Sequence, residues 1–162
     1  MDTFETIEKR RSIRDFTGES IPKDDIIKIV DAGRLAPSGS NKQLWDFIVV
    51  TDKEILEQLS IAGSWSAKAG AIIVVVMDPV TKYWVEDGSA AIENMLLAAT
   101  ALGYGSCWLQ GNAKPHEEAF KRLLEVPEHL KLLTLIPIGI PTAWPAAKQK
   151  KPLEEVIHWE KF

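Results

Sequence analysis

The stretch AIIVVVM at residues 71–77 is an unbroken run of apolar side chains, most of them β-branched. β-branched residues favour strands, and a run without polar alternation is typical of a strand that is buried on both faces. We therefore predict that this stretch forms the centre of a sheet. Two further apolar runs, Phe47–Val50 and Leu132–Ile138, are predicted strands of the same sheet.

Helical patterns alternate with these strands. Apolar residues recur at helical spacing, and turn or capping residues bound each pattern. The predicted helices are 3–11, a second from about Pro22 to before Pro37, a third opened by a Thr51–Glu54 capping box, 85–102 with Gly103 as its C-terminal cap, and 115–124. No repeat or linker interrupts the order, so we expect one domain over 1–162.

The charge balance limits the classes of partner. A net charge of −4 with 26% charged residues does not favour a protein that coats nucleic acid or an anionic membrane, so any anion site must be local. The single cysteine, Cys107, cannot form an intramolecular disulfide, and no Cys/His spacing suggests a metal. We expect a cytoplasmic protein without a signal peptide, because Met1 is followed by polar residues and no apolar run could span a bilayer.

A basic cluster follows the first helix. Arg10, Arg11, Ser12 and Arg14 combine guanidinium groups with a hydroxyl within five residues, a set that suits one phosphate and a neighbouring polyol. A solvated basic surface is the open alternative.

The segment APSGSNKQLW at 36–45 carries two hydroxyls and two carboxamides in a turn-rich loop. Such groups can hydrogen-bond the polar edge of a planar heterocycle, although a plain connection between a helix and a strand remains open. No phosphate-binding loop of the Walker type is present. Gly103-x-Gly105 follows a helix rather than a strand, so it is not a dinucleotide fingerprint.

These segments together resemble a known family. RRSIRDF at 10–16 and APSGSNKQLW at 36–45 are similar to the two leading motifs of the nitroreductase family; AATALGYGSCW at 98–108 and the segment from Gly139 to Trp159 resemble its core-helix end and its terminal segment. Four motifs occur in order across nearly the whole chain. The resemblance implies an α+β fold, with a mixed sheet flanked by helices on both faces and a C-terminal tail exchanged across a homodimer.

The resemblance also implies a bound FMN and the residues that hold it. The phosphate and ribityl chain would contact Arg10, Ser12, Lys148 and Lys150, with Arg11 contributing through its backbone or its charge, and Arg14 would face the N1/O2 edge of the flavin. The partner subunit would cover the ring edge with Pro37, Ser38, Ser40, Asn41 and Gln43. Backbone amides at Gln110 and Gly111 would approach O4 and N5, with Gly111 as a close-approach glycine.

The implied reaction is ping-pong. NADH or NADPH gives hydride to the flavin and leaves, and a nitroaromatic, quinone or similar small acceptor then takes the electrons in the same pocket. No side chain need act as acid or base, so we expect no catalytic residue and no metal. The preferred nicotinamide and the acceptor stay open. Leu44 departs from the family's usual proline, Gly39 would loosen the same loop, and Cys107 is interpreted as buried packing.

Two other classes of function stay open on the sequence. One is a flavin-binding or redox-sensing module with little turnover. The other is a nucleic-acid or anion-binding protein that uses 9–14 and 148–151, which the acidic balance disfavours.

Overall fold

The computed structural model describes residues 1–162 and contains one four-stranded sheet in the order β1-β2-β4-β3. The strands are β1 (Trp45–Val50), β2 (Ala71–Met77), β3 (Gly105–Ser106) and β4 (Lys131–Gly139). The prediction of a central strand at 71–77 is confirmed: every residue of β2 is buried, and Val74 pairs with Ile48 on one side and Leu135 on the other. The predicted mixed sheet needs a correction, because all three strand pairs are antiparallel and the parallel pairing is confined to an isolated bridge between Ser12 and Ser106.

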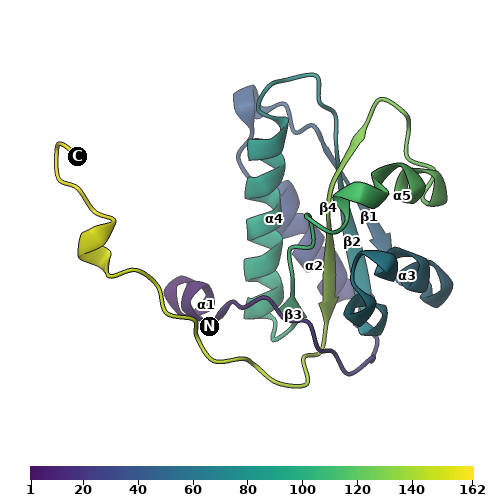
Figure 1. Cartoon of the computed structure of the whole chain (residues 1–162), viewed down its shortest axis with the longest axis horizontal. Coiled ribbons are helices and arrows are strands. Elements are labelled where there is room, and N and C mark those ends of the chain that lie inside the picture. Colours follow the sequence, from purple (N-terminus) through teal and green to yellow (C-terminus); the bar gives the residue numbers. More distant parts are fainter.

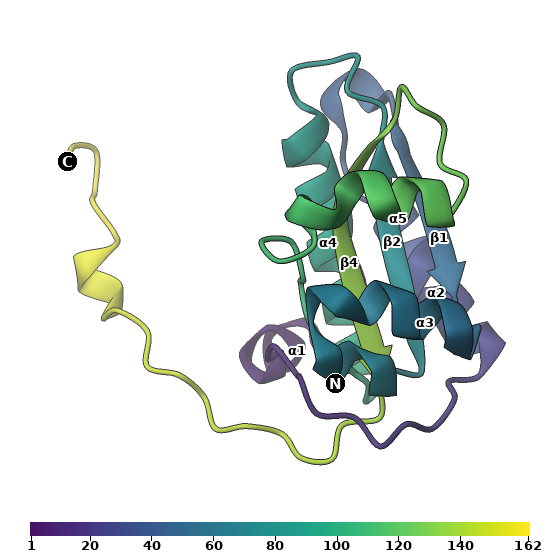
Figure 2. The same cartoon turned by 45° about the vertical axis from the view of Figure 1, so that its right-hand side comes forward.

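Helices cover both faces of the sheet, as the resemblance implied. They are α1 (Thr3–Lys9), α2 (Lys23–Arg34), α3 (Lys53–Leu59), α4 (Trp84–Ala101) and α5 (Glu117–Leu123). Figures 1 and 2 show α2 and α4 packed on one face, and α3 and α5 on the other. Side chains of β2 alternate between two apolar cores accordingly, with Ile73 and Val75 in the α2/α4 core and Ile72 and Val74 in the α3/α5 core.

The helix ends follow local chemistry. Gly103 has a φ of +89° just after α4, as predicted for a C-terminal cap. The Thr51 capping box is wrong: Asp52 is the N-cap of α3, and its carboxylate accepts the N–H groups of Glu54 and Ile55. Helix α1 ends at Lys9 rather than residue 11, because the backbone becomes extended at Arg10.

The N-terminal arm, residues 10–16, lies along β3. The Ile13 N–H donates to the Ser106 carbonyl at 2.9 Å, and the Ile13 and Phe16 side chains are buried. A Cβ at position 105 would lie 2.8 Å from Ile13, and one at position 139 would lie 2.7 Å from the Phe16 ring. Glycine is therefore required at both positions for the arm to dock.

The tail, residues 145–162, is exposed along its whole length. Apart from the short 3₁₀ turn η5 (Leu153–Glu155), it has no regular structure. Both ribbon views show it leaving the body beside α1 and ending far from the sheet (Figures 1 and 2). No helix in the chain combines the length and apolar character that crossing a membrane requires.

Candidate functional site

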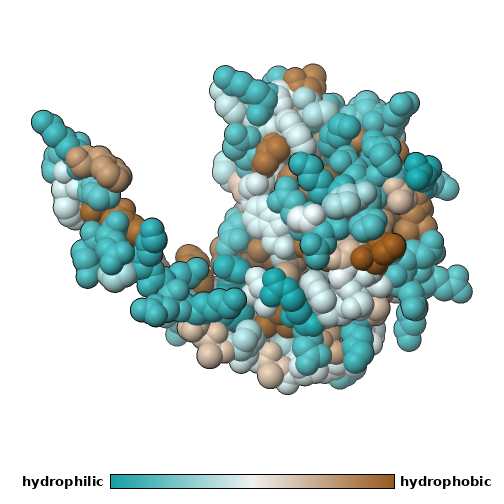
Figure 3. Space-filling view, viewed as in Figure 1, coloured by the Kyte–Doolittle hydropathy of each residue, from teal (hydrophilic) through white to brown (hydrophobic).

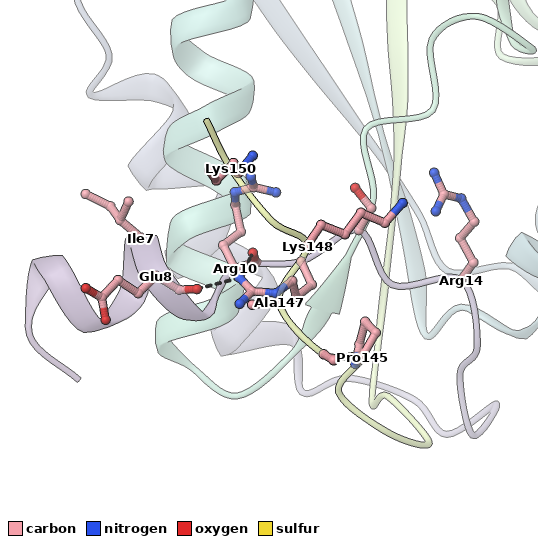
Figure 4. A pocket seen from close by; sticks show the side chains of 11 residues that line it. Ile7, Glu8, Arg10, Arg14, Pro145, Ala147, Lys148 and Lys150 are labelled. Carbon is pink, nitrogen blue, oxygen red and sulfur yellow. Dashed lines mark hydrogen bonds between the residues drawn. The ribbon is translucent and has the colours of Figure 1, made fainter. Parts of the chain in front are cut away.

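A cavity of about 670 Å³, called here the basic pocket, lies between α1, the N-terminal arm and the start of the tail. Figure 4 shows the side chains of Arg10, Lys148 and Lys150 gathered in it, with Arg14 at the far end. Its lining is Ile7, Glu8, Arg10, Arg11, Ser12, Arg14, Pro145, Ala146, Ala147, Lys148 and Lys150. The predicted phosphate and ribityl residues therefore come together, although more than a hundred residues separate the arm from the tail.

The arm presents its polar residues because its apolar residues are anchored. Ile13 is buried in the α3/α5 core, and Ser12 and Arg14 on either side of it line the pocket. The Arg10 Nε lies 3.1 Å from Glu93 Oε1 on α4, with both side chains partly exposed. Glu93 thus sets the direction of the Arg10 side chain, a contact that no local sequence pattern indicates.

Arg11 is turned toward the end of α1. Its Nη1 donates to the carbonyls of Glu8 and Arg10, while its buried Nε has no partner. The two hydrogen bonds of Nη1 hold the arm to the end of α1.

Arg14 has no acidic partner within salt-bridge distance. Its guanidinium carbon lies 5.9 Å from the centroid of the Trp65 ring, which in turn lies 6.2 Å from the ring of Phe16. An aromatic face orients a guanidinium without neutralising it. The positive charge of Arg14 therefore remains available to a ligand, and Trp65 is a positioning contact that we did not predict.

The base of the tail is fastened to the arm. Thr142 donates from its N–H to the Asp15 carbonyl at 3.2 Å and from its hydroxyl to the Asp15 carboxylate at 2.7 Å. The Lys9 ammonium lies 5.2 Å from the ring centroid of Trp144. These contacts fix the chain up to Trp144 and so place Lys148 and Lys150 at the pocket.

Cys107 lies behind the pocket and is buried. Burial raises the pKa of the thiol above its ordinary value, while the charge of Arg14, a hydrogen bond with Ser12 and the charge of Arg10 act in the opposite direction. Since burial is the larger effect, the thiol stays protonated at neutral pH. This agrees with the interpretation of Cys107 as packing.

The flavin loop of the prediction, residues 37–43, does not reach the basic pocket. It forms the 3₁₀ turn η1 (Gly39–Asn41) beside the first turn of α4, and in Figure 1 its blue coil lies at the top of that helix, away from α1. Ser40, Asn41 and Gln43 are exposed and have positive φ values of 53°, 55° and 52°. None of Pro37, Ser38, Ser40, Asn41 and Gln43 lines the pocket.

Gln110 and Gly111 occupy a third place, in the turn after Leu109. Leu109 pairs with Leu135 of β4, which fixes the start of this turn at the sheet. Gln110 is half-buried and Gly111 is exposed, and a Cβ at position 111 would meet nothing within 4 Å. The chain itself therefore supplies no steric reason for a glycine at position 111.

Comparison with known proteins agrees with this arrangement. The sequence profile of the Nitroreductase family matches residues 7–71 and 62–140. A protein of Archaeoglobus fulgidus, provisionally named NADH dehydrogenase/NAD(P)H nitroreductase, is 44% identical over 151 residues, which cover 86% of each chain.

Two solved structures share the fold over essentially the whole chain. An FMN-dependent nitroreductase from Clostridium difficile superposes with a TM-score of 0.90 at 31% identity, covering 99% of this chain and 100% of that one. A nitroreductase with bound FMN from Bacteroides fragilis superposes with a TM-score of 0.84 at 30% identity, with the same coverage. With a family profile that matches most of its residues and a relative that is 44% identical, the chain belongs to the nitroreductase family.

Proposed function

We propose that this chain is an FMN-dependent oxidoreductase that transfers electrons from NADH or NADPH to a small acceptor such as a nitroaromatic or a quinone. The basic pocket carries the proposal: it gathers five cationic side chains and a hydroxyl around one cavity. Family membership and the names of the relatives support it, since those names state NAD(P)H nitroreductase activity and bound FMN.

The pocket fits the phosphate end of FMN. Arg10, Lys148 and Lys150 would hold the phosphate, Ser12 would contact the ribityl chain, and Arg11 would add its positive charge. Glu8 is the one acidic residue in the lining. A cavity of this size and charge is suited to a mononucleotide with a single phosphate.

The ring end would be governed by Arg14. Bound FMN would supply the redox chemistry, accepting two electrons from a nicotinamide and releasing them to the acceptor. The role of the protein is to place a positive charge where negative charge collects, and the Arg14 guanidinium, oriented by Trp65 and free of any carboxylate, can do so. No general acid or base is proposed.

We propose that a complete site needs two chains, because the 37–43 loop lies apart from the pocket of its own chain. In a homodimer this loop would cover the flavin of the partner. The tail shows brown, hydrophobic patches in Figure 3. Its exposed large apolar side chains are Leu153, Val156, Ile157, Trp159 and Phe162. The outer face of α4 is also partly exposed at Ala90 and Leu97. We propose that α4 and the tail form the interface, with the tail lying on the partner.

We propose a ping-pong order. A single pocket would receive the nicotinamide and the acceptor in turn. The nicotinamide must then leave before the acceptor can enter.

The experiment begins with purified protein. We expect it to be yellow, to release FMN rather than FAD on denaturation, and to oxidise NADH or NADPH in the presence of a quinone, with parallel double-reciprocal lines. A colourless protein that does not bind added FMN would contradict the proposal. Bound FMN that neither nicotinamide bleaches would favour a flavin-binding module without turnover.

A further inference from the structure

The 37–43 loop has an unfavourable backbone conformation at three residues. Ser40, Asn41 and Gln43 all lie in the left-handed region, with φ between 52° and 55°. This region is unfavourable for residues with a side chain, and such conformations persist only where surrounding contacts fix them. The contacts that fix this loop are therefore part of whatever the loop does.

Four of its hydrogen bonds are internal. The Asn41 N–H donates to the Ser38 carbonyl at 2.9 Å, and the Lys42 N–H donates to the Gly39 carbonyl at 3.2 Å. The Gln43 N–H donates to Ser38 Oγ at 3.0 Å, and the Gln43 side-chain amide donates to the Asn41 carbonyl at 3.2 Å. One side chain from elsewhere in the fold binds the loop: Asp87 Oδ1, in the first turn of α4, accepts the Gly39 N–H at 2.9 Å.

Asp87 is buried beside the loop, where it can accept the Gly39 N–H. It is 7% exposed, and its Oδ2 has no hydrogen-bond partner. A Cβ on Gly39 would lie 3.8 Å from that Oδ2 and 3.3 Å from the Tyr83 ring, so the loop backbone packs directly on the start of α4. The predicted loosening by Gly39 is therefore wrong, because a glycine here permits close packing and its N–H is fixed.

Stabilisation of the helix N-terminus does not account for Asp87. The neighbouring Glu86 also lies in the first turn of α4 and is exposed, so it can interact with the positive end of the helix without losing its hydration. Burying a carboxylate with one unpartnered oxygen is costly, and the contact that it makes in return is the one to Gly39.

We propose that Asp87 is a positioning residue for the flavin. By fixing Gly39, it holds Ser38, Ser40 and Asn41 in the one arrangement that can hydrogen-bond the ring edge of the FMN in the partner subunit. This inference rests on the proposed function. It adds a residue from α4 to the determinants of ring binding, separate from the basic pocket that holds the phosphate.

The test compares the holoprotein with Asp87→Ala, Asp87→Asn and Glu86→Ala. Glu86→Ala is the matched control, because it removes the same charge from the same helical turn at an exposed site. For each variant we would measure FMN affinity, the fluorescence and visible spectrum of the bound flavin, and the mass of the dimer. Competition by inorganic phosphate would report on the phosphate end alone.

We expect Asp87→Ala to weaken FMN binding by roughly tenfold to a hundredfold, as for the loss of a hydrogen bond to a charged group, and to raise the fluorescence of bound flavin. Asp87→Asn keeps Oδ1 as an acceptor and should restore most of the affinity. Glu86→Ala should have the FMN affinity and flavin spectrum of the wild type. The affinity for inorganic phosphate, measured by competition, should be the same in every variant as in the wild type. Wild-type affinity and spectrum in Asp87→Ala, or an equal loss in Glu86→Ala, would overturn the inference.

A second pair of variants covers the case in which Asp87→Ala does not fold. Gly39→Pro deletes the donor and leaves Asp87 intact, while Gly39→Ala adds a Cβ and keeps the N–H. Ser38, which precedes it, has the extended backbone that a following proline favours. Both variants add a Cβ that would lie 3.3 Å from the Tyr83 ring, so the proline should weaken ring binding more than the alanine does, by the part that the N–H contributes. Equal loss in the two variants would contradict the role of this hydrogen bond. If the wild-type protein itself binds no FMN, the proposed function fails instead.

Discussion

The basic pocket and the 37–43 loop differ in how they are built, although both were predicted to bind the same cofactor. The pocket is assembled within one chain: the arm docks through Ile13 and Phe16, and Thr142 fastens the tail beside it. The loop has three residues with positive φ, is bound by Asp87 from α4, and contributes no residue to the lining of the basic pocket.

This difference indicates a division of labour between two copies. A surface that can hold a phosphate needs only charges in one place, and one chain supplies them. A surface that hydrogen-bonds the flavin ring needs a fixed set of donors and acceptors. The chain has such a set in the 37–43 loop, which lies away from its own basic pocket. Assembly should therefore affect ring binding more strongly than phosphate binding.

The largest effect should come from removing residues 152–162. This truncation retains Lys148 and Lys150, so any loss of FMN binding must arise through assembly. We expect light scattering to show a monomer, and FMN affinity to fall by about 3 kcal/mol or more as several ring contacts are lost together. Glu154→Ala with Glu155→Ala, which keeps the apolar side chains of the tail, is the control. A truncated monomer that retains its FMN would show that one chain makes the whole site.

Some parts of this arrangement could be predicted and others could not, for physical reasons. The bounds of β2 follow from its β-branched run, and the end of α4 follows from Gly103, because both are set by neighbouring residues. Leu35 falls within the stretch predicted as the second helix, yet it is 65% exposed, because it lies at the C-cap where α2 has already ended.

Contacts between segments that are distant in the sequence could not be predicted from local patterns. An aspartate in the first turn of a helix is expected for its charge alone, so nothing marked Asp87 as the partner of Gly39, 48 residues away. Glu93 and Trp65 carry no local signal for their contacts with Arg10 and Arg14 either. The joining of the arm to Lys148 and Lys150 was predicted only through resemblance to a family.

A smaller effect is expected from single cations of the pocket. Arg10→Ala and Lys150→Ala should each weaken FMN binding by about 1–3 kcal/mol, the usual loss for a charge-assisted contact with phosphate. Titration of the apoprotein with FMN measures this, and riboflavin, which lacks the phosphate, should bind the variants and the wild type alike. Lys151→Ala is the matched control, because Lys151 neighbours Lys150 but does not line the pocket. Unchanged affinity in both variants would mean that the phosphate lies elsewhere.

Arg14→Ala should change the redox potential more than the affinity. Loss of an unneutralised cation beside the ring should lower the midpoint potential by on the order of 30–60 mV, or about 1.4–2.8 kcal/mol for two electrons. Stopped-flow bleaching by NADH or NADPH should slow, while reoxidation by a quinone should suffer less, because a lower potential favours electron donation. Arg34→Ala, which removes a surface guanidinium paired with Asp31, is the control. An unchanged potential would exclude Arg14 from the ring edge.

The smallest effect concerns Cys107, which reports on the pocket without taking part in binding. Burial raises the pKa of its thiol above the ordinary value of 9.0, and the charge of Arg14 offsets part of that rise. Arg14→Ala should therefore raise the thiol pKa further, whereas Asp87→Ala, which changes only the loop, should leave it alone. Because Cys107 is the only cysteine, ¹³C labelling of its Cβ allows the titration to be followed by NMR without ambiguity.

The same thiol has a consequence for stability. A pKa that is higher in the folded than in the unfolded chain contributes stability that is fully present below about pH 9 and is lost as the pH rises through the folded value. The wild type should thus lose stability above pH 9 more steeply than Cys107→Ala, as measured by urea unfolding at several pH values. A thiol pKa at or below 9.0 would contradict the effect of burial. An equal response to Arg14→Ala and Asp87→Ala would show that the pocket and the loop are not electrostatically separate.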